Sequence, residues 1–288
     1  MRMRTWLLST TCLAGVAAMG AAQAAGLPDG YGGLPDYGSL PAVSAPNGKL
    51  SAFGGSRDGS IFGVTGSFAV PLGHAFGLQI DGAVGSAKSA AFYGFGGHVF
   101  WRDPAKGLLG LYSSYAKWDA ASTASATTLT GGVIDTTGAE VGKIGAEGAA
   151  YLGRVSLEGF AGYQFGSRTG FTGKATLAFY PTDDLRLDGG VRYLDGIGTV
   201  GTIGAEWRPH EGSGLTLYAA GAAGNGNYRQ ILGGVRFYFA DQGKSLIRRH
   251  REDDPGVDLP DDLFTTTGGV HCPAGQSITT FDGNTFCQ

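Results

Sequence analysis

Charged residues, cysteines and long apolar runs are all scarce in this chain of 288 residues. Charged residues make up 16% of it, against about 25% in an average soluble domain, and the net charge is −3. With no basic surplus, the composition does not predict a nucleic-acid-binding protein. Beyond the N-terminal region no stretch reaches about 18 consecutive apolar residues, so we expect no transmembrane helix. A helical period of 3.6 residues is also missing over any useful length.

The N-terminal residues 1–24 predict a secretory signal peptide. A basic start (MRMR) precedes an apolar run, and the small-x-small sequence Ala22–Ala24 is typical of a cleavage site. A lipoprotein signal that uses Cys12 is the alternative, although the residues before this cysteine do not form a lipobox. Removal of the signal leaves Cys272 and Cys287. In an oxidising compartment we expect these two to form a disulfide.

Glycine is abundant, with 53 residues in 288, or about 18% where about 7% is average. Residues 25–47 are rich in Gly, Pro and Tyr and predict a linker on the periplasmic side. Residues 48–240 divide into about twelve strand-length pieces (10–14), most of which alternate with period two. Residues 241–288 predict a charged, solvated periplasmic tail whose last part contains a hairpin signal at Asp282-Gly283.

Alternation gives each predicted strand one apolar and one polar face, because successive side chains point to opposite sides. In LRLDGGVRYL (185–194), one parity holds Leu185, Leu187, Val191 and Tyr193, and the charged residues share the other. If the apolar face contacts lipid, the charged parity lines a lumen. The predicted lumen-facing charges are Asp81, Lys143, Glu147, Glu158, Lys174, Arg186, Asp188, Arg192, Glu206, Arg208 and Arg236.

Three features favour a membrane barrel over an exported soluble β-protein, which remains the alternative. The apolar parity contains many Gly and Ala residues, which would pack poorly as a core. Connections are short at one predicted end and more variable at the other, where residues 119–138 form a long one. Aromatic residues gather near strand ends, as in the girdles of membrane barrels: Trp101, Trp118, Tyr151, Phe165, Tyr193, Trp207 and Phe239.

The sequence ATLAFYPTDDLRLDGGVRYL (175–194) resembles the tight-turn hairpins of proteobacterial outer-membrane β-barrel (porin-like) proteins. LGGVRFYF (232–239) resembles their closing strand, which ends in an aromatic residue, here Phe239, although 49 residues follow it. The resemblance implies an all-β, up-and-down antiparallel transmembrane barrel in the outer membrane of a Gram-negative bacterium. It also implies contact with outer-membrane lipid, the barrel-assembly machinery and periplasmic chaperones.

No catalytic, cofactor or metal site is predicted, because no histidine has the spacing of a triad or a metal site. His98 is expected to be an ordinary lumen side chain. The expected function is therefore non-enzymatic, as a structural envelope component or a narrow passive channel. A surface-interaction barrel and a lipid-modifying enzyme remain alternatives. The near balance of acids and bases in the lumen favours a narrow or closed passage, and the sequence is silent on the oligomeric state.

Overall fold

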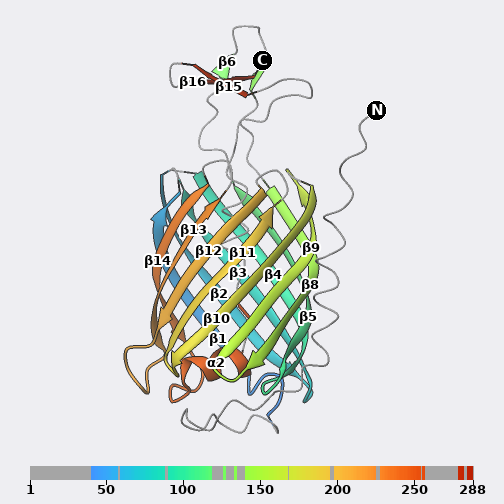
Figure 1. Ribbon diagram of the computed structural model, residues 1–288, viewed down its shortest axis with the longest axis vertical. Helices are drawn as coiled ribbons and strands as arrows, with labels where there is room; N and C mark the ends of the chain where they lie inside the picture. Colours follow the sequence, from blue (N-terminus) through green and yellow to red (C-terminus); the bar gives the residue numbers. More distant parts are fainter. Residues whose placement is uncertain are drawn as a thin grey trace.

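The computed structural model of the protein is a closed antiparallel β-barrel of twelve strands (Figure 1). It describes residues 40–57, 59–87, 90–118, 126–127, 133–134, 140–167, 169–194, 198–224, 228–253, 255–256, 278–281 and 284–287. The predicted signal peptide and Cys272 lie outside the described residues. Among the described residues, no helix is long and apolar enough to cross a membrane.

The barrel strands follow one another around the wall in chain order, and β1 pairs with β14 to close it. They are β1 (Asn47–Ser56), β2 (Ser60–Leu72), β3 (Phe76–Ala87), β4 (Ala90–Asp103), β5 (Gly107–Trp118), β8 (Glu140–Leu152), β9 (Val155–Gly166), β10 (Gly170–Thr182), β11 (Leu185–Leu194), β12 (Gly198–Trp207), β13 (Leu215–Gly224) and β14 (Arg229–Tyr238). The predicted up-and-down topology and strand count are both confirmed.

Five further elements complete the described part of the chain. Strands β6 (Ala126–Thr127) and β7 (Val133–Ile134) pair within the connection between β5 and β8. Helix α2 (Leu246–Glu252) follows the last barrel strand. Strands β15 (Ile278–Phe281) and β16 (Asn284–Cys287) form the predicted C-terminal hairpin.

We call the end of the barrel at which β1 begins and β14 ends the terminal end, and the opposite end the loop end. Helix α2 lies across the terminal end (Figure 1). The predicted asymmetry of the connections rests on a single one, 119–139 at the loop end. The other loop-end connections are as short as most turns at the terminal end, where 208–214 is the longest.

The wall has an apolar outer face and a mixed inner face. On the outside, Leu111 is 64% exposed and Ile203 is 71% exposed, whereas the neighbouring inner residue Tyr112 is 1% exposed. A soluble protein does not display such an extensive apolar surface. In lipid it is the stable arrangement, because a closed barrel satisfies its backbone hydrogen bonds internally.

Two residues of the predicted aromatic girdle face inward instead. Trp118 is 5% exposed and lies 5.1 Å from Phe92, ring centre to ring centre. Tyr151 is 8% exposed and lies under the guanidinium of Arg251. Both sit at strand ends, as predicted, but on the inner parity. Trp118 belongs to an inner apolar cluster in the loop-end half, together with Phe53, Ile61, Ala83, Ala87, Phe92, Ala116, Val141 and Leu232.

Candidate functional site

The structure places all eleven charged residues of the predicted lumen set away from the outer surface, and none of them is exposed. Arg208 differs from the others in position. It follows the end of β12 and binds both carboxylate oxygens of Asp184, at 2.7 and 2.9 Å, in the turn between β10 and β11. It therefore stands at the terminal mouth rather than midway along the lumen. Phe239, the predicted closing aromatic, follows β14, is 58% exposed and donates its backbone N–H to Gly48.

His98 on β4 is held between two acids of the lumen wall. Its Nε2 lies 2.9 Å from Asp81 Oδ2, and its Nδ1 lies 2.9 Å from both carboxylate oxygens of Glu147. The ring also stacks on Tyr112, with centroids 4.4 Å apart. Because the two carboxylates lie on opposite sides of the imidazole, they cannot converge on one metal ion. This group joins three strands, β3, β4 and β8, across the inner wall.

Arginine–carboxylate pairs tie other strands together. Arg186 forms a two-pronged contact with Glu158, with both N···O distances 3.0 Å, and also donates to Asp188. Arg236 pairs with Glu206, whose other oxygen accepts hydrogen bonds from Thr216 and Tyr238. The two-pronged pair of Arg186 and Glu158 is strong and directional. Both pairs connect strands of the wall and leave less net charge facing the lumen.

The terminal mouth is occupied by the segment after β14, which the sequence predicted to be a solvated linker. That prediction is wrong for residues 244–253. Leu246 and Ile247 are fully buried, and Ile247 packs against Tyr180 and Ala178 of β10. The turn between β10 and β11 anchors the start of α2: Asp184 accepts from Leu246 N at 3.0 Å, and Asp183 O accepts from Ile247 N at 3.0 Å.

The cationic side chains of α2 are satisfied mainly by backbone carbonyls, which is why a basic segment can be buried. Arg249 is 1% exposed and donates to the carbonyls of Ala240, Asp241 and Lys244. Arg251 is 2% exposed and donates to Gly153 O, at 2.7 Å, and to Val155 O on the barrel rim. The sequence does not indicate these carbonyl partners, so the arginines of α2 were interpreted as part of a solvated, charged segment.

Residues before β1 enter the same mouth, although the sequence predicted a linker there. Val43 is fully buried and packs with Ala69, Phe100 and Leu108 on the inner wall. Gly77 provides its niche, since a Cβ at that position would lie 2.6 Å from Val43 Cγ2. Backbone hydrogen bonds from Ala42 N to His74 O (2.7 Å) and from Ser44 N to Glu252 O (2.9 Å) hold the segment in place.

Residues 41–46 and 244–253 thus form one unit, which we call the plug. Its centre is Lys244, which is 3% exposed. Lys244 Nζ lies 2.7 Å from Asp253 Oδ1, 2.7 Å from Ser44 Oγ and 3.1 Å from Glu252 Oε2. Ser44 donates to the same Asp253 oxygen at 2.6 Å. One ammonium group therefore joins the two ends of the barrel chain.

His250 connects the plug to the lumen wall. Its Nδ1 lies 2.9 Å from Tyr180 Oη, its Nε2 lies 3.1 Å from Tyr238 Oη, and Glu206 Oε2 is 3.6 Å away. Burial lowers the pKa of His250 below its ordinary value of 6.5, and this outweighs the opposing effect of Glu206. The histidine is neutral in the docked plug at neutral pH.

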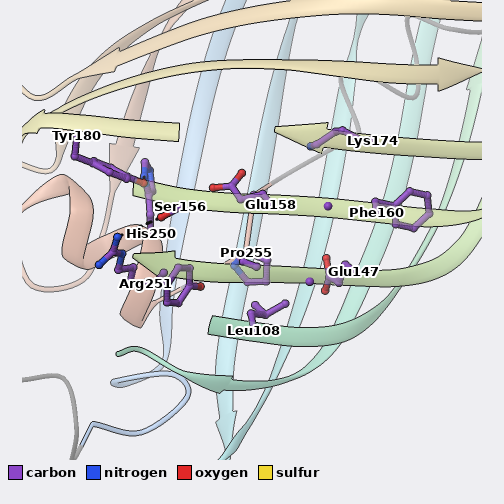
Figure 2. A pocket seen from close by; sticks show the side chains of 15 residues that line it. Leu108, Glu147, Ser156, Glu158, Phe160, Lys174, Tyr180, His250, Arg251 and Pro255 are labelled. Atoms are coloured by element: carbon purple, nitrogen blue, oxygen red, sulfur yellow. Dashed lines mark hydrogen bonds between the residues drawn. The ribbon is translucent and has the colours of Figure 1, made fainter. Parts of the chain in front are cut away.

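A small cavity of about 70 Å³ lies between the plug and the wall formed by β8, β9 and β10 (Figure 2). Glu147, Glu158 and Lys174 line its wall side, and His250 and Arg251 of the plug line the opposite side together with Pro255. This volume accommodates a few water molecules. Ser156 also lines the cavity, and its hydroxyl accepts a hydrogen bond from Arg251 at 3.3 Å. The polar lining suits water or a small solute.

No protein-family model matches this chain, and no curated protein matches its sequence. Among solved structures, a KdgM porin has a TM-score of 0.50 at 11% identity, over 66% of this chain and 99% of the porin. The COG4313 outer membrane channel from Pseudomonas putida F1 has a TM-score of 0.46 at 12% identity, over 72% of this chain and 99% of the channel. Outer membrane phospholipase A from Escherichia coli has a TM-score of 0.44 at 13% identity, over 71% and 98%. At these identities the likeness concerns the fold alone, and that fold is the one of outer-membrane β-barrel proteins.

Proposed function

We propose that the protein is an integral barrel of a Gram-negative outer membrane and acts without enzymatic chemistry as a narrow passive channel held closed by its plug. The apolar outer face supports insertion in lipid. Outer-membrane barrels have short periplasmic turns and longer extracellular loops, and the long connection 119–139 is at the loop end. The proposed orientation therefore has the terminal end, with α2, on the periplasmic side. Insertion would require the barrel-assembly machinery and periplasmic chaperones.

The plug is the observation that carries this proposal. A purely structural barrel can fill its lumen with apolar side chains, and the inner cluster around Trp118 lies on part of the wall in the loop-end half. The terminal mouth is instead closed by two chain segments held through hydrogen bonds and ion pairs, such as those of Lys244. Polar contacts of this kind can be exchanged for water when a segment moves away. They suit a closure that can be reversed.

A structural envelope role is the second candidate, favoured by that same inner apolar cluster. If the cluster blocks the passage independently of the plug, release of the plug would open nothing. The two candidates therefore differ in one measurable property, the conductance of a barrel whose plug has been removed.

The test is single-channel conductance in planar bilayers. The refolded chain from residue 25 is compared with a chain of residues 47–240, which lacks both segments of the plug and keeps all twelve barrel strands. Insertion of both is checked by heat-dependent gel mobility. Stepwise conductance only after truncation supports the plugged channel. Steady conductance of the intact chain would show that the plug does not close the lumen, and silence of both inserted chains would favour the structural role.

A further inference from the structure

The side chain of Arg251 in the plug contacts a group of oxygen atoms on the barrel wall. Its Nη2 atom lies 2.7 Å from Gly153 O, 3.2 Å from Val155 O and 3.3 Å from Ser156 Oγ. Gly153 belongs to the turn between β8 and β9, and the other two residues begin β9. All three oxygens are uncharged acceptors, so they suit a weakly hydrated cation whose charge is spread over a planar group.

Two tyrosine rings of the wall complete the surroundings of this guanidinium group. Its central carbon lies 5.0 Å from the ring centre of Tyr151 on β8 and 5.9 Å from that of Tyr180 on β10. Both distances are within the range of a cation–π interaction, about 6 Å. We call the wall groups that surround the guanidinium the guanidinium site: Tyr151, Gly153, Val155, Ser156 and Tyr180.

Pairing within the wall holds the guanidinium site in shape. Tyr151 and Ser156 are directly opposite each other in the β8–β9 register. The backbone N–H of Tyr180 donates to Arg154 O at 2.9 Å, and Arg154 Nη1 donates to Tyr180 O at 3.2 Å. Gly153, in the same turn as Arg154, has a φ of 58°, a left-handed backbone that glycine adopts without strain. Because none of these contacts involves a plug residue, the site keeps its shape when α2 leaves.

We propose that the guanidinium site binds small guanidinium compounds, and that Arg251 occupies it in place of such a ligand when the plug is docked. Tyr151, Ser156 and Tyr180 also line the cavity of about 70 Å³, which offers room for a substituent on the ligand (Figure 2). A ligand that binds only the released state shifts the equilibrium toward release. A guanidinium compound is therefore a ligand that frees the plug. The statement that this release opens a passage rests on the proposed function.

Plug release in the full chain tests the site, with methylguanidine as the probe and methylammonium as the control of equal charge. Peptide mass spectrometry follows cleavage after Glu252, which is 1% exposed in the docked plug. A glutamate-specific protease is used because it does not recognise guanidinium groups. The cleavage rate should rise linearly with the methylguanidine concentration, by the factor 1 + [L]/Kd, and should stay unchanged with methylammonium. No rise with methylguanidine, or an equal rise with both cations, would overturn the proposal.

Arg251→Ala is the matched variant, because it empties the guanidinium site in the docked plug. Methylguanidine then binds the docked and the released state without a competitor, so it should not accelerate cleavage of this variant. In the parent chain, Ser156→Ala removes one acceptor of the site and should reduce the slope of the methylguanidine response. Equal acceleration in the parent and in Arg251→Ala, or an unchanged slope in Ser156→Ala, would overturn the proposal.

Single-channel conductance of the full chain separates this inference from the proposed function. Methylguanidine should produce stepwise current at the concentrations that accelerate cleavage. Accelerated cleavage without current would overturn the passive channel and leave the ligand site standing. Unchanged cleavage would overturn the ligand site, whereas the conductance of residues 47–240 would still decide the channel.

Discussion

Replacement of Lys244 by methionine should release the plug without unfolding the barrel. Lys244 is the shared cation of Glu252 and Asp253, which are 1% and 3% exposed. Breaking a buried ion pair from one side costs about 3–5 kcal/mol, because the partner charge stays buried. The lower figure applies here, since Glu252 keeps Arg248 at 2.6 and 3.0 Å and Asp253 keeps the Ser44 hydroxyl. About 3 kcal/mol corresponds to about a 150-fold weaker docking equilibrium.

Limited proteolysis measures that equilibrium, since cleavage of a transiently open segment follows the population of the open form. An arginine-specific protease cuts after Arg248, Arg249 and Arg251 only when α2 is released. The cleavage rate of Lys244→Met should rise about 150-fold, with the heat-dependent gel mobility of the barrel unchanged.

The matched control is Lys106→Met at the same end of the barrel. Lys106 also pairs with an acid, Asp103 at 2.9 Å, but its side chain is 79% exposed. An exposed pair contributes about 0–1 kcal/mol, so the cleavage rate should stay within about fivefold of the parent. Equal cleavage rates for Lys244→Met and Lys106→Met would refute the central role of the buried ammonium group.

Three further predictions concern the niche of the plug, its pH dependence and the outer face. Gly77→Val should clash with both Phe100 and Val43, which pack together, and so displace Val43 from its niche. Plug release, measured by the same proteolysis, should increase, whereas Gly82→Val, where an added Cβ meets nothing within 4 Å, should leave it unchanged. Burial lowers the pKa of His250, so His250 takes up a proton less readily in the docked plug than in the released one. The docked state therefore has its full stability above about pH 6.5 and loses stability as the pH drops below that value. Cleavage should therefore accelerate as the pH falls from 7.5 to 5.5, and His250→Gln should reduce this acceleration. The groups that face His250 are Glu206, Arg186, Lys49 and the hydroxyls of Tyr180 and Tyr238. An unchanged pH profile in His250→Gln would contradict the role of His250. Leu111→Arg on the outer face should lower the free energy of unfolding in lipid vesicles by about 2–4 kcal/mol. Ala105→Arg in a terminal-end turn should leave this free energy unchanged. Equal stability of the two variants would argue against lipid contact.

Alternation was enough to predict the barrel, because a wall that is one strand thick imposes a period of two on every strand. The same rule gave the inner parity of residues such as Arg186 and Glu206. The girdle prediction failed at Trp118 and Tyr151, because it took nearness to a strand end as membership of the girdle and ignored parity. Parity alone would have placed Trp118 inward, since it alternates in step with Tyr112.

The plug could not be predicted, because its stability comes from partners that are distant in the sequence. Ser44 and Asp253 are separated by 209 residues, and the arginines of α2 bind carbonyl groups that any sequence offers. Seven helical residues with four charges and a histidine read as a solvated run. Lys49 was within reach of the parity argument, since it shares the inner face of β1 with Ser51 and Phe53, but its acceptor, Pro255 O, was not.

The contact between the two ends of the barrel chain also has a consequence for biogenesis. Residues 41–46 precede β1 and α2 follows β14, and these two strands form the closing seam from Lys49–Tyr238 to Ser56–Ile231. The bonds between Ser44, Lys244 and Asp253 can form only once that seam has brought both termini together. Docking of the plug is therefore the last step of assembly at this end, and it takes place only in a barrel whose β1–β14 seam is closed. A barrel stalled with an open seam would leave α2 undocked and open to proteolysis, so the bonds of this lysine, serine and aspartate distinguish finished molecules from unfinished ones.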